Sequence, residues 1–195
     1  SATGGWFNGT LDGRGYAISD INITEKSLFI NVSPYATIKN LAIINVTGAS
    51  AVIAQTFYGA IKDVYVHGAL TGAPSALVAV AADSVANLGY AHDEIIENVI
   101  VNVTATGAWV DGGTFRFISG AAAKCYAAVT NCYAISGIAT GLYSETAWGA
   151  AVGTDKVYNG NEAFLENAEG LLENFGEFWK VAEGKVYFGN RLIIG

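Results

Sequence analysis

The chain has 195 residues, of which 52% are hydrophobic and 14% are charged, and its formal net charge is −7. This length predicts one domain, or one domain with a small appendage, that can bury a core without metals or disulfides. The acidic balance and the lack of any run of Lys or Arg argue against nucleic acid as a partner. No stretch approaches the roughly 20 apolar residues of a membrane span, so we expect no direct membrane insertion.

The first predicted element combines turn residues with an alternating apolar run. The 24 glycines of the chain favour a β-rich fold with many tight turns. Residues Gly9 to Gly15 contain the turn pair Asp12-Gly13 and are predicted to form a corner rather than a ligand site. The hexapeptide Ile18 to Ile23 follows, in the pattern apolar, polar, Asn or Asp, apolar, variable, apolar.

That hexapeptide pattern returns four more times along the chain. The further copies are Ile38 to Ile43, Ile61 to Val66, Ile96 to Val101 and Val129 to Ala134. Alternation on both sides of a fixed polar residue predicts a strand, a corner and another strand. A second family of apolar segments falls between the copies, at residues 27–30, 51–54, 76–80, 114–118 and 149–152. Such repeats share a continuous interior only when they stack, which predicts an all-β, right-handed parallel β-helix of about five to six coils.

The polar residue at the centre of the repeat is predicted to form a structural ladder at one corner. Asn tolerates the left-handed backbone conformation there, and its amide bonds the coils above and below. The same register directs Cys132 into the core as an inert small hydrophobe, while any pairing with Cys125 stays open. The ladder residues are Asp20, Asn40, Asp63, Asn98 and Asn131.

Two segments carry a resemblance to a known family. The stretch Phe7 to Ile18, with Leu28-Phe29 and Ile38 to Leu41 after it, resembles the right-handed β-helix repeats, including the GLUG type, of bacterial adhesin-like cell-surface proteins. Similar repeats occur in some phage structural proteins. The resemblance covers about residues 6–155, and the ending from Phe178 to Ile194 is similar to the closing segment of such helices. It implies surface display or adhesion, and it supplies no catalytic motif.

The C-terminal residues are predicted to cap the β-helix. Asn161 can cap a helix from Glu162, with apolar residues at helical spacing up to Phe175. Two apolar segments, at residues 178–181 and 185–188, then predict a hairpin, and together these elements would cover the last coil. We therefore divide the chain into a parallel β-helix at residues 1–158 and a capping helix and hairpin at residues 159–195. The N-terminal edge is expected to be continued by more of a longer parent chain, by a neighbouring subunit, or by Trp6 and Phe7 folding back.

The late loops are the candidate binding site. If successive loops stack, they bring aromatic rings beside acids, a combination that suits sugars because rings pack on aromatics and hydroxyls bond carboxylates. The alternative is that the two aromatic residues pack the loop base. The candidate ligand-binding residues are Trp109, Asp111, Tyr143 and Glu145.

Catalysis lacks a matching constellation in the sequence. Polysaccharide hydrolysis needs two nearby carboxylates, and neither outward row of the predicted strands pairs acids. His67 and His92 lie far apart with no partner pattern for a metal or a nucleophile, and no cofactor is expected. Five Asn-x-Ser/Thr sequons are interpreted as chance products of Asn- and Thr-rich strands.

The sequence thus predicts a non-catalytic module of a larger extracellular or cell-surface protein. Its expected partners are glycans or a host or bacterial surface receptor. One alternative is a structural component of a virion or extracellular filament. Another is a polysaccharide lyase or hydrolase.

Overall fold

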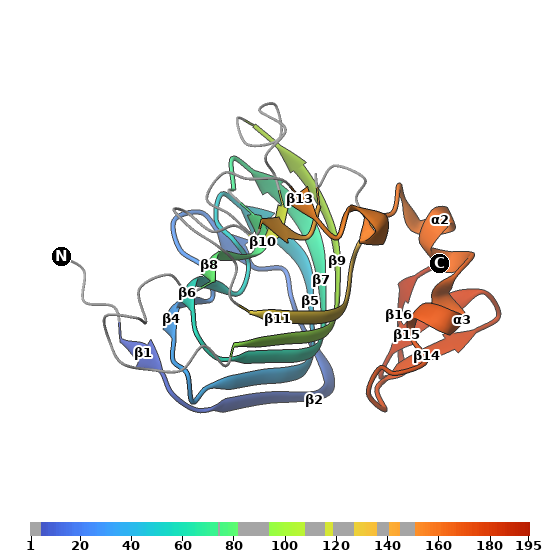
Figure 1. The fold of residues 1–195 in the computed structure, drawn as a ribbon, viewed down its shortest axis with the longest axis horizontal. Helices are drawn as coiled ribbons and strands as arrows, with labels where there is room; N and C mark the ends of the chain where they lie inside the picture. The colour runs from blue at the N-terminus through green and yellow to red at the C-terminus, as the bar shows by residue number, and fades with distance from the viewer. Residues whose placement is uncertain are drawn as a thin grey trace.

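The fold is mostly β, with parallel sheets and little helix (Figure 1). The computed structural model describes residues 5–73, 75–81, 94–107, 116–118, 127–135, 141–144 and 151–195. Among these residues no helix has the length and apolar character needed to cross a membrane.

The long strands form a parallel sheet, here called the large sheet, in the order β2-β5-β7-β9-β11, with β3 also paired to β5. Their bounds are β2 (Thr10–Ser19), β3 (Asn22–Ile23), β5 (Thr37–Gly48), β7 (Ala60–Thr71), β9 (Ile95–Thr106) and β11 (Ala128–Ala134).

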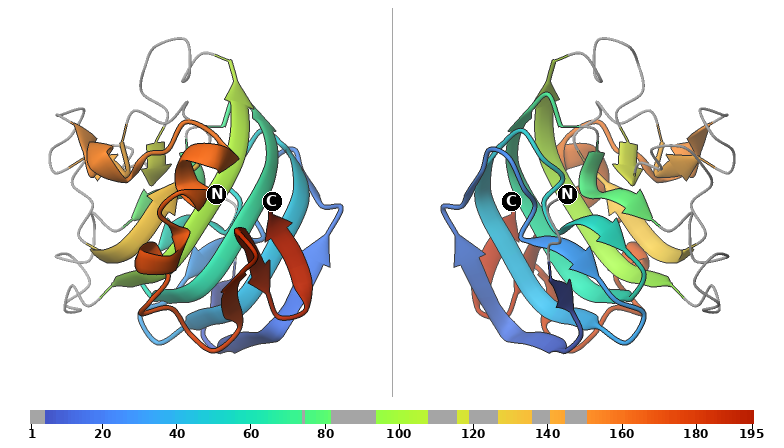
Figure 2. Two further views of the ribbon diagram at one scale, coloured as in Figure 1. Left: turned by 90° about the vertical axis from the view of Figure 1, so that its right-hand side faces the viewer. Right: turned by 90° about the vertical axis from the view of Figure 1, so that its left-hand side faces the viewer.

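Short strands form the second parallel sheet, the small sheet, in the order β1-β4-β6-β8-β10. Its members are β1 (Trp6–Phe7), β4 (Phe29–Val32), β6 (Ala54–Phe57), β8 (Ser75–Ala81) and β10 (Arg116–Ile118). Along the chain the long strands β2, β5, β7, β9 and β11 alternate with these short ones, so neighbours in either sheet belong to successive repeats (Figures 1 and 2).

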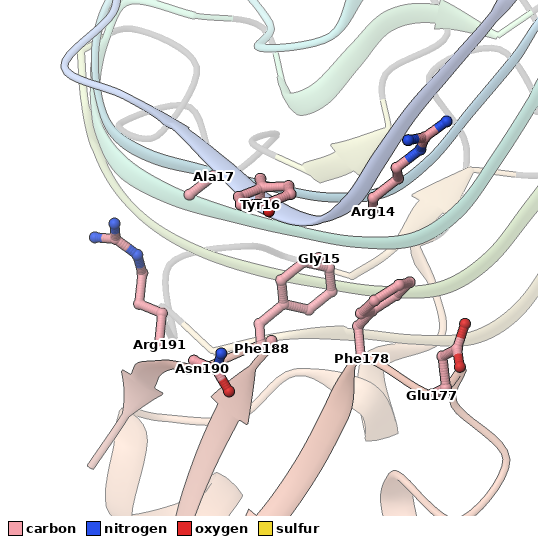
Figure 3. Close-up of a pocket in the computed structure, with 10 residues that line it drawn as sticks. Arg14, Gly15, Tyr16, Ala17, Glu177, Phe178, Phe188, Asn190 and Arg191 are labelled. Carbon is pink, nitrogen blue, oxygen red and sulfur yellow. The ribbon is translucent and has the colours of Figure 1, made fainter.

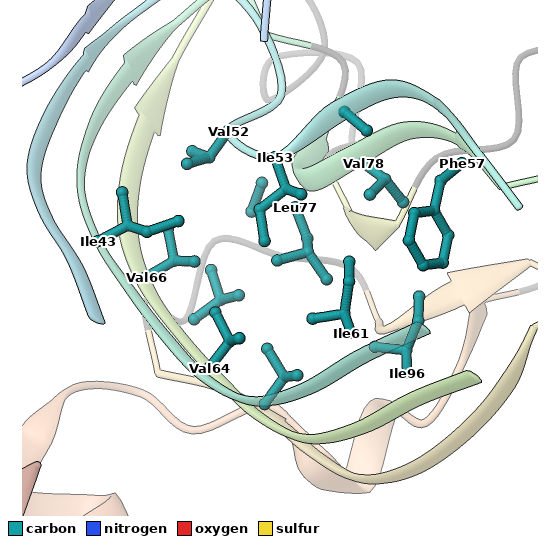
Figure 4. Packing of buried hydrophobic residues seen from close by; sticks show 14 of the residues in the cluster. Ile43, Val52, Ile53, Phe57, Ile61, Val64, Val66, Leu77, Val78 and Ile96 are labelled. Carbon is teal, nitrogen blue, oxygen red and sulfur yellow. The ribbon is translucent and has the colours of Figure 1, made fainter. Parts of the chain in front are cut away.

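The main core fills the space between the two sheets (Figure 4). Equivalent inward positions of neighbouring strands carry matching apolar residues, as in the fully buried row Ile38, Ile61 and Ile96. Two residues of the small-sheet side pack into the same cluster: Ile53, which directly precedes β6, and Leu77, which lies in β8. Burying each such side chain stabilises the fold by roughly 1.5–3 kcal/mol, which explains why stacked repeats are stable when single ones are not.

A left-handed residue bends each of the strands β5, β7, β9 and β11 in its middle. Asn40, Asp63, Asn98 and Asn131 have φ values of 54°, 53°, 56° and 50°. The bend explains why positions on both sides of it, such as Ile38 and Leu41, face the same core although they lie three residues apart. Nδ2 of Asn131 donates to Oδ1 of Asn98 over 3.1 Å, and Nδ2 of Asn98 donates to Oδ1 of Asp63 over 3.2 Å.

Asp20 does not stand in that row, contrary to the prediction from the repeat. The β2–β5 register pairs Asp12 with Lys39 and Tyr16 with Leu41, so that residues 13–15 lie opposite Asn40. Asn40 Nδ2 accordingly donates to Oδ1 of Asp12 over 3.0 Å. Asp20 instead receives a 3.1 Å hydrogen bond from Nδ2 of Asn45, and both residues are left-handed, with φ values of 60° and 55°. The extra residues of β2 displace its hexapeptide from the common register.

The C-terminal segment lies beside the large sheet. Its elements are η2 (Thr154–Lys156), α2 (Asn161–Leu165), α3 (Ala168–Leu171), β14 (Trp179–Ala182), β15 (Lys185–Phe188) and β16 (Arg191–Ile194). The segments expected to form a hairpin, β14 and β15, pair antiparallel, and β16 adds a third strand. A separate short pair joins β12 (Tyr143–Ser144) to β13 (Ala151–Val152).

The position of this segment differs from the expected cap over the last coil. It covers the outer face of the large sheet, across β2 to β11 (Figure 2, left). Tyr65, Ile100 and Tyr133 point outward from neighbouring strands and form a second core with Phe164 and Trp179. The outward row of these strands is apolar, and burying it favours the lateral position.

The expected single helix from Glu162 to Phe175 is also wrong in its extent. The chain forms two short helices, α2 and α3, that are separated at Glu166 and Asn167. Asn167, which lies in the interruption, has low helix propensity and so favours it.

Candidate functional site

The late-loop candidate falls mostly outside the described residues. Trp109, Asp111 and Glu145 belong to segments that the structure does not describe. Tyr143 lies in β12, where its backbone pairs with Val152. The proximity of these four residues therefore stays a prediction.

The described part of the chain contains a row of outward polar side chains, here called the polar row, formed by Asp20, Asn45, His67 and Asn102. These residues come from four successive repeats: Asp20 directly follows β2, and the other three lie in β5, β7 and β9. The register pairs His67 with Asn102, and it changes so that Ile44 and Asn45 together stand opposite His67. The irregularity at left-handed Asn45 thereby places polar groups on a face that is apolar nearer the middle of the strands.

Two hollows flank the polar row and share Asn45 and His67. One has a volume of about 340 Å³, and the other, toward the C-terminal strands, about 250 Å³. Together they form the outer groove, whose main polar lining residues are Asn45, Thr47, His67, Asn102, Thr104 and Arg191.

Hydrogen bonds to the C-terminal segment hold one wall of the outer groove in place. Nδ2 of Asn102 donates to Oδ1 of Asn161 over 2.9 Å and lies 3.5 Å from the hydroxyl of Tyr65. The Tyr65 hydroxyl donates to the carbonyl oxygen of Ile193 over 3.0 Å. These bonds fix the groove wall before any ligand arrives, which reduces the entropic cost of binding.

His67 places an imidazole ring in the outer groove, beside the buried ring of Tyr65. It stacks on Tyr65 with an interplanar angle of 8° and a centroid distance of 6.4 Å. Burial lowers the pKa of His67 below its usual value, so the imidazole is neutral at neutral pH. A neutral imidazole offers one donor and one acceptor to a ligand.

The acid beside the groove is held in its ionised form. Hydrogen bonds from Ser19 and Asn45, together with the charge of Arg191, lower the pKa of Asp20. Asp20 therefore acts as a hydrogen-bond acceptor and not as a proton donor at neutral pH. Within the described ranges, no group of three or more His, Cys, Asp or Glu side chains could hold a metal ion.

A further hollow, the arginine cleft, lies between β2 and the C-terminal strands (Figure 3). Its volume is about 540 Å³, and its side-chain lining includes Arg14, Tyr16, Glu177, Phe178, Phe188, Asn190 and Arg191. The stretch Gly9 to Gly15, predicted to be only a corner, contributes Arg14 and Gly15 to this cleft. Local sequence gave no sign of the cleft because its two walls come from opposite ends of the chain.

No family model, curated protein or solved structure matches this chain.

Proposed function

We propose that this chain is a non-catalytic carbohydrate-binding module built on a right-handed parallel β-helix, with the outer groove as a binding site. Strands that alternate between two parallel sheets with successive repeats in register support the β-helix. The right-handed sense follows from the strong preference of parallel crossovers for that hand. The resemblance of the repeats supports display on an adhesin-like extracellular surface protein.

The observation that carries the proposal is the row of polar groups across neighbouring strands. Amide, imidazole and hydroxyl groups of Asn45, His67 and Thr104 face one continuous groove. Neighbouring strands lie about 4.8 Å apart, so an extended sugar chain laid across them meets a new set of donors and acceptors at each strand. Sugar hydroxyls need such paired donors and acceptors.

Binding fits the groove better than glycoside hydrolysis does. The hydrolytic mechanism uses one carboxylic acid and one carboxylate on either side of the scissile bond. Asp20 is the one carboxylate in the polar row, and Oδ1 of Asp20 already accepts a hydrogen bond from Asn45. The groove thus supplies hydrogen bonds to a ligand without the acid and base pair.

The test is binding of the purified chain to a broad glycan array. We expect selective binding that falls about tenfold in His67→Ala, because one ligand hydrogen bond is lost. Lys62→Gln is the matched control, since Lys62 lies on the same strand, pairs with Glu97 at 3.1 Å and does not line the groove. Trp109→Ala reports separately on the late loops.

Three results would redirect the proposal. Loss of binding in Trp109→Ala alone would move the site to the late loops. Absence of binding to any glycan would favour the structural component of a virion or filament. New reducing or unsaturated sugar ends in the incubation would favour a lyase or hydrolase.

A further inference from the structure

The arginine cleft concentrates positive charge in an acidic protein. The net charge of the chain is −7, yet two of its three arginines, Arg14 and Arg191, line this one cleft. Both are exposed, and Figure 3 shows them on either side of Tyr16. A guanidinium group presents a planar fork of donors that matches a carboxylate, so the pair favours a ligand that carries one.

Neither guanidinium forms an ion pair with a carboxylate of the described chain, although Arg191 interacts electrostatically with Asp20 over a longer distance. No described acid lies within ion-pair distance of Arg14 or Arg191. The nearby acid Asp12 is engaged elsewhere: Oδ2 lies 3.5 Å from Nζ of Lys39, and Oδ1 accepts hydrogen bonds from Asn40 and from the backbone of Arg14. Glu177 lines the cleft without forming an ion pair with either arginine. The donors of both guanidinium groups are therefore not occupied by an ion pair and can bind an external anion, which at Arg191 competes with the more distant charge of Asp20.

Arg14 has the left-handed backbone conformation that Asn or Asp adopts at the equivalent positions of the neighbouring strands. Arg14 has a φ of 51°, and it stands opposite Asn40, within the row that continues through Asp63 and Asn98. Asn and Asp adopt this conformation with less strain than Arg does. A residue retained against a local preference is a candidate for function.

The walls of the cleft provide the remaining contacts for a sugar ring. Tyr16 is 76% exposed and faces the partly buried Phe178 across the cleft, whereas Phe188 of β15 is 1% exposed and offers no ring face to a ligand (Figure 3). Phe178 packs directly on Gly15, where a Cβ would clash, so the corner and the C-terminal strands are held together. Aromatic faces take the apolar side of a ring, and the amide of Asn190 and the carboxylate of Glu177 can bond its hydroxyls. The cleft volume of about 540 Å³ falls in the range typical of ligand sites.

Arg191 connects the cleft to the outer groove, because it lines both hollows. From this continuity we infer that the ligand is an acidic oligosaccharide, whose carboxylate-bearing sugar occupies the arginine cleft while neighbouring units extend along the outer groove. The inference rests on the proposed glycan-binding function and names the class of glycan.

The experiment is an array that carries acidic oligosaccharides, each beside its carboxyl-reduced counterpart. The full chain should prefer the acidic member of a pair. Arg14→Asn should lower affinity for that member about tenfold while leaving affinity for the reduced member unchanged, because one charge-assisted contact is lost. Arg191→Gln should also lower affinity for the acidic member about tenfold, and it should lower affinity for the carboxyl-reduced member by a smaller factor.

Two controls separate contact from folding and from overall charge. Arg14→Asn installs the residue type that the ladder uses elsewhere, so its melting temperature should equal or exceed that of the parent chain. Lys180→Gln removes one positive charge from an exposed position on β14 outside the cleft and should leave the preference intact.

The outcomes distinguish the two proposals. Equal binding of acidic and reduced members overturns the acidic-sugar inference and leaves the glycan-binding function standing. Binding to no member overturns both. A preference for acidic members that persists in both arginine variants also overturns the inference, because the carboxylate is then recognised elsewhere.

Discussion

Replacing Asn98 should be among the most destabilising changes in the ladder. Its side chain is 6% exposed and takes part in three hydrogen bonds, with Asp63, Asn131 and the backbone oxygen of Asn174. Losing three such bonds costs about 3 kcal/mol in total, at about 1 kcal/mol each. The φ of 56° adds about 1 kcal/mol for Ala, which adopts this conformation poorly. Asn98→Ala should therefore lower the free energy of unfolding by about 4 kcal/mol, a large part of the 5–15 kcal/mol typical of a domain.

Urea denaturation followed by circular dichroism measures this loss. Asn98→Gly serves as the matched variant, because it removes the same hydrogen bonds and relieves the backbone strain. It should be about 1 kcal/mol more stable than Asn98→Ala. A loss below about 1 kcal/mol in Asn98→Ala would refute the assigned role of the ladder. Equal stability of the Ala and Gly variants would refute the conformational part of the argument.

Two further predictions concern ionisable groups whose pKa is shifted by desolvation. Burial raises the pKa of the Cys132 thiol to about 12. In a Cys125→Ser background, a maleimide should therefore label the chain at pH 8 only after unfolding. Rapid labelling of the folded chain would contradict the strand register that directs Cys132 into the core. Burial lowers the pKa of His67 below 6.5, so the unfolded chain binds more protons there than the folded one. The contribution of the neutral His67 ring to the free energy of unfolding is therefore fully present above about pH 6.5, and it is lost as the pH falls through the lowered pKa. His67→Gln should therefore lose less stability than the parent chain between pH 7.5 and pH 5 in urea titrations, and parallel pH profiles would show that burial does not perturb this ring.

The strands of the large sheet were predictable because their inward positions repeat around one polar residue. Asn40, Asp63, Asn98 and Asn131 mark bends in β5, β7, β9 and β11. The repeat wrongly predicts Asp20 as a ladder residue because the hexapeptide around Asp20 has the same pattern as the hexapeptides around the bends. The two additional residues opposite Asn40 shift β2, and this shift is visible only in the pairing of β2 with β5.

The lateral position of the C-terminal segment has a signal in the sequence of the large sheet. The outward positions of its strands carry the apolar or aromatic residues Tyr65, Ile100 and Tyr133. A row of this kind predicts a cover over the sheet face. The arginine cleft had no such signal, because Arg14 and Arg191 are brought together only by this packing.

The lateral contacts of the C-terminal segment also bear on how the chain folds. In an array where each repeat touches only its neighbours, unfolding can begin at one repeat and spread gradually. Here the Gly176 backbone donates to Asp63, Tyr65 bonds the backbone of Ile193, and Phe178 packs on Gly15, so one segment spans several repeats. Loosening any of these repeats also strains its contacts with the shared segment, which makes the whole sheet melt cooperatively. Since residues 161–194 follow all the strands they cover, this cooperativity arises only after the last long strand has been synthesised.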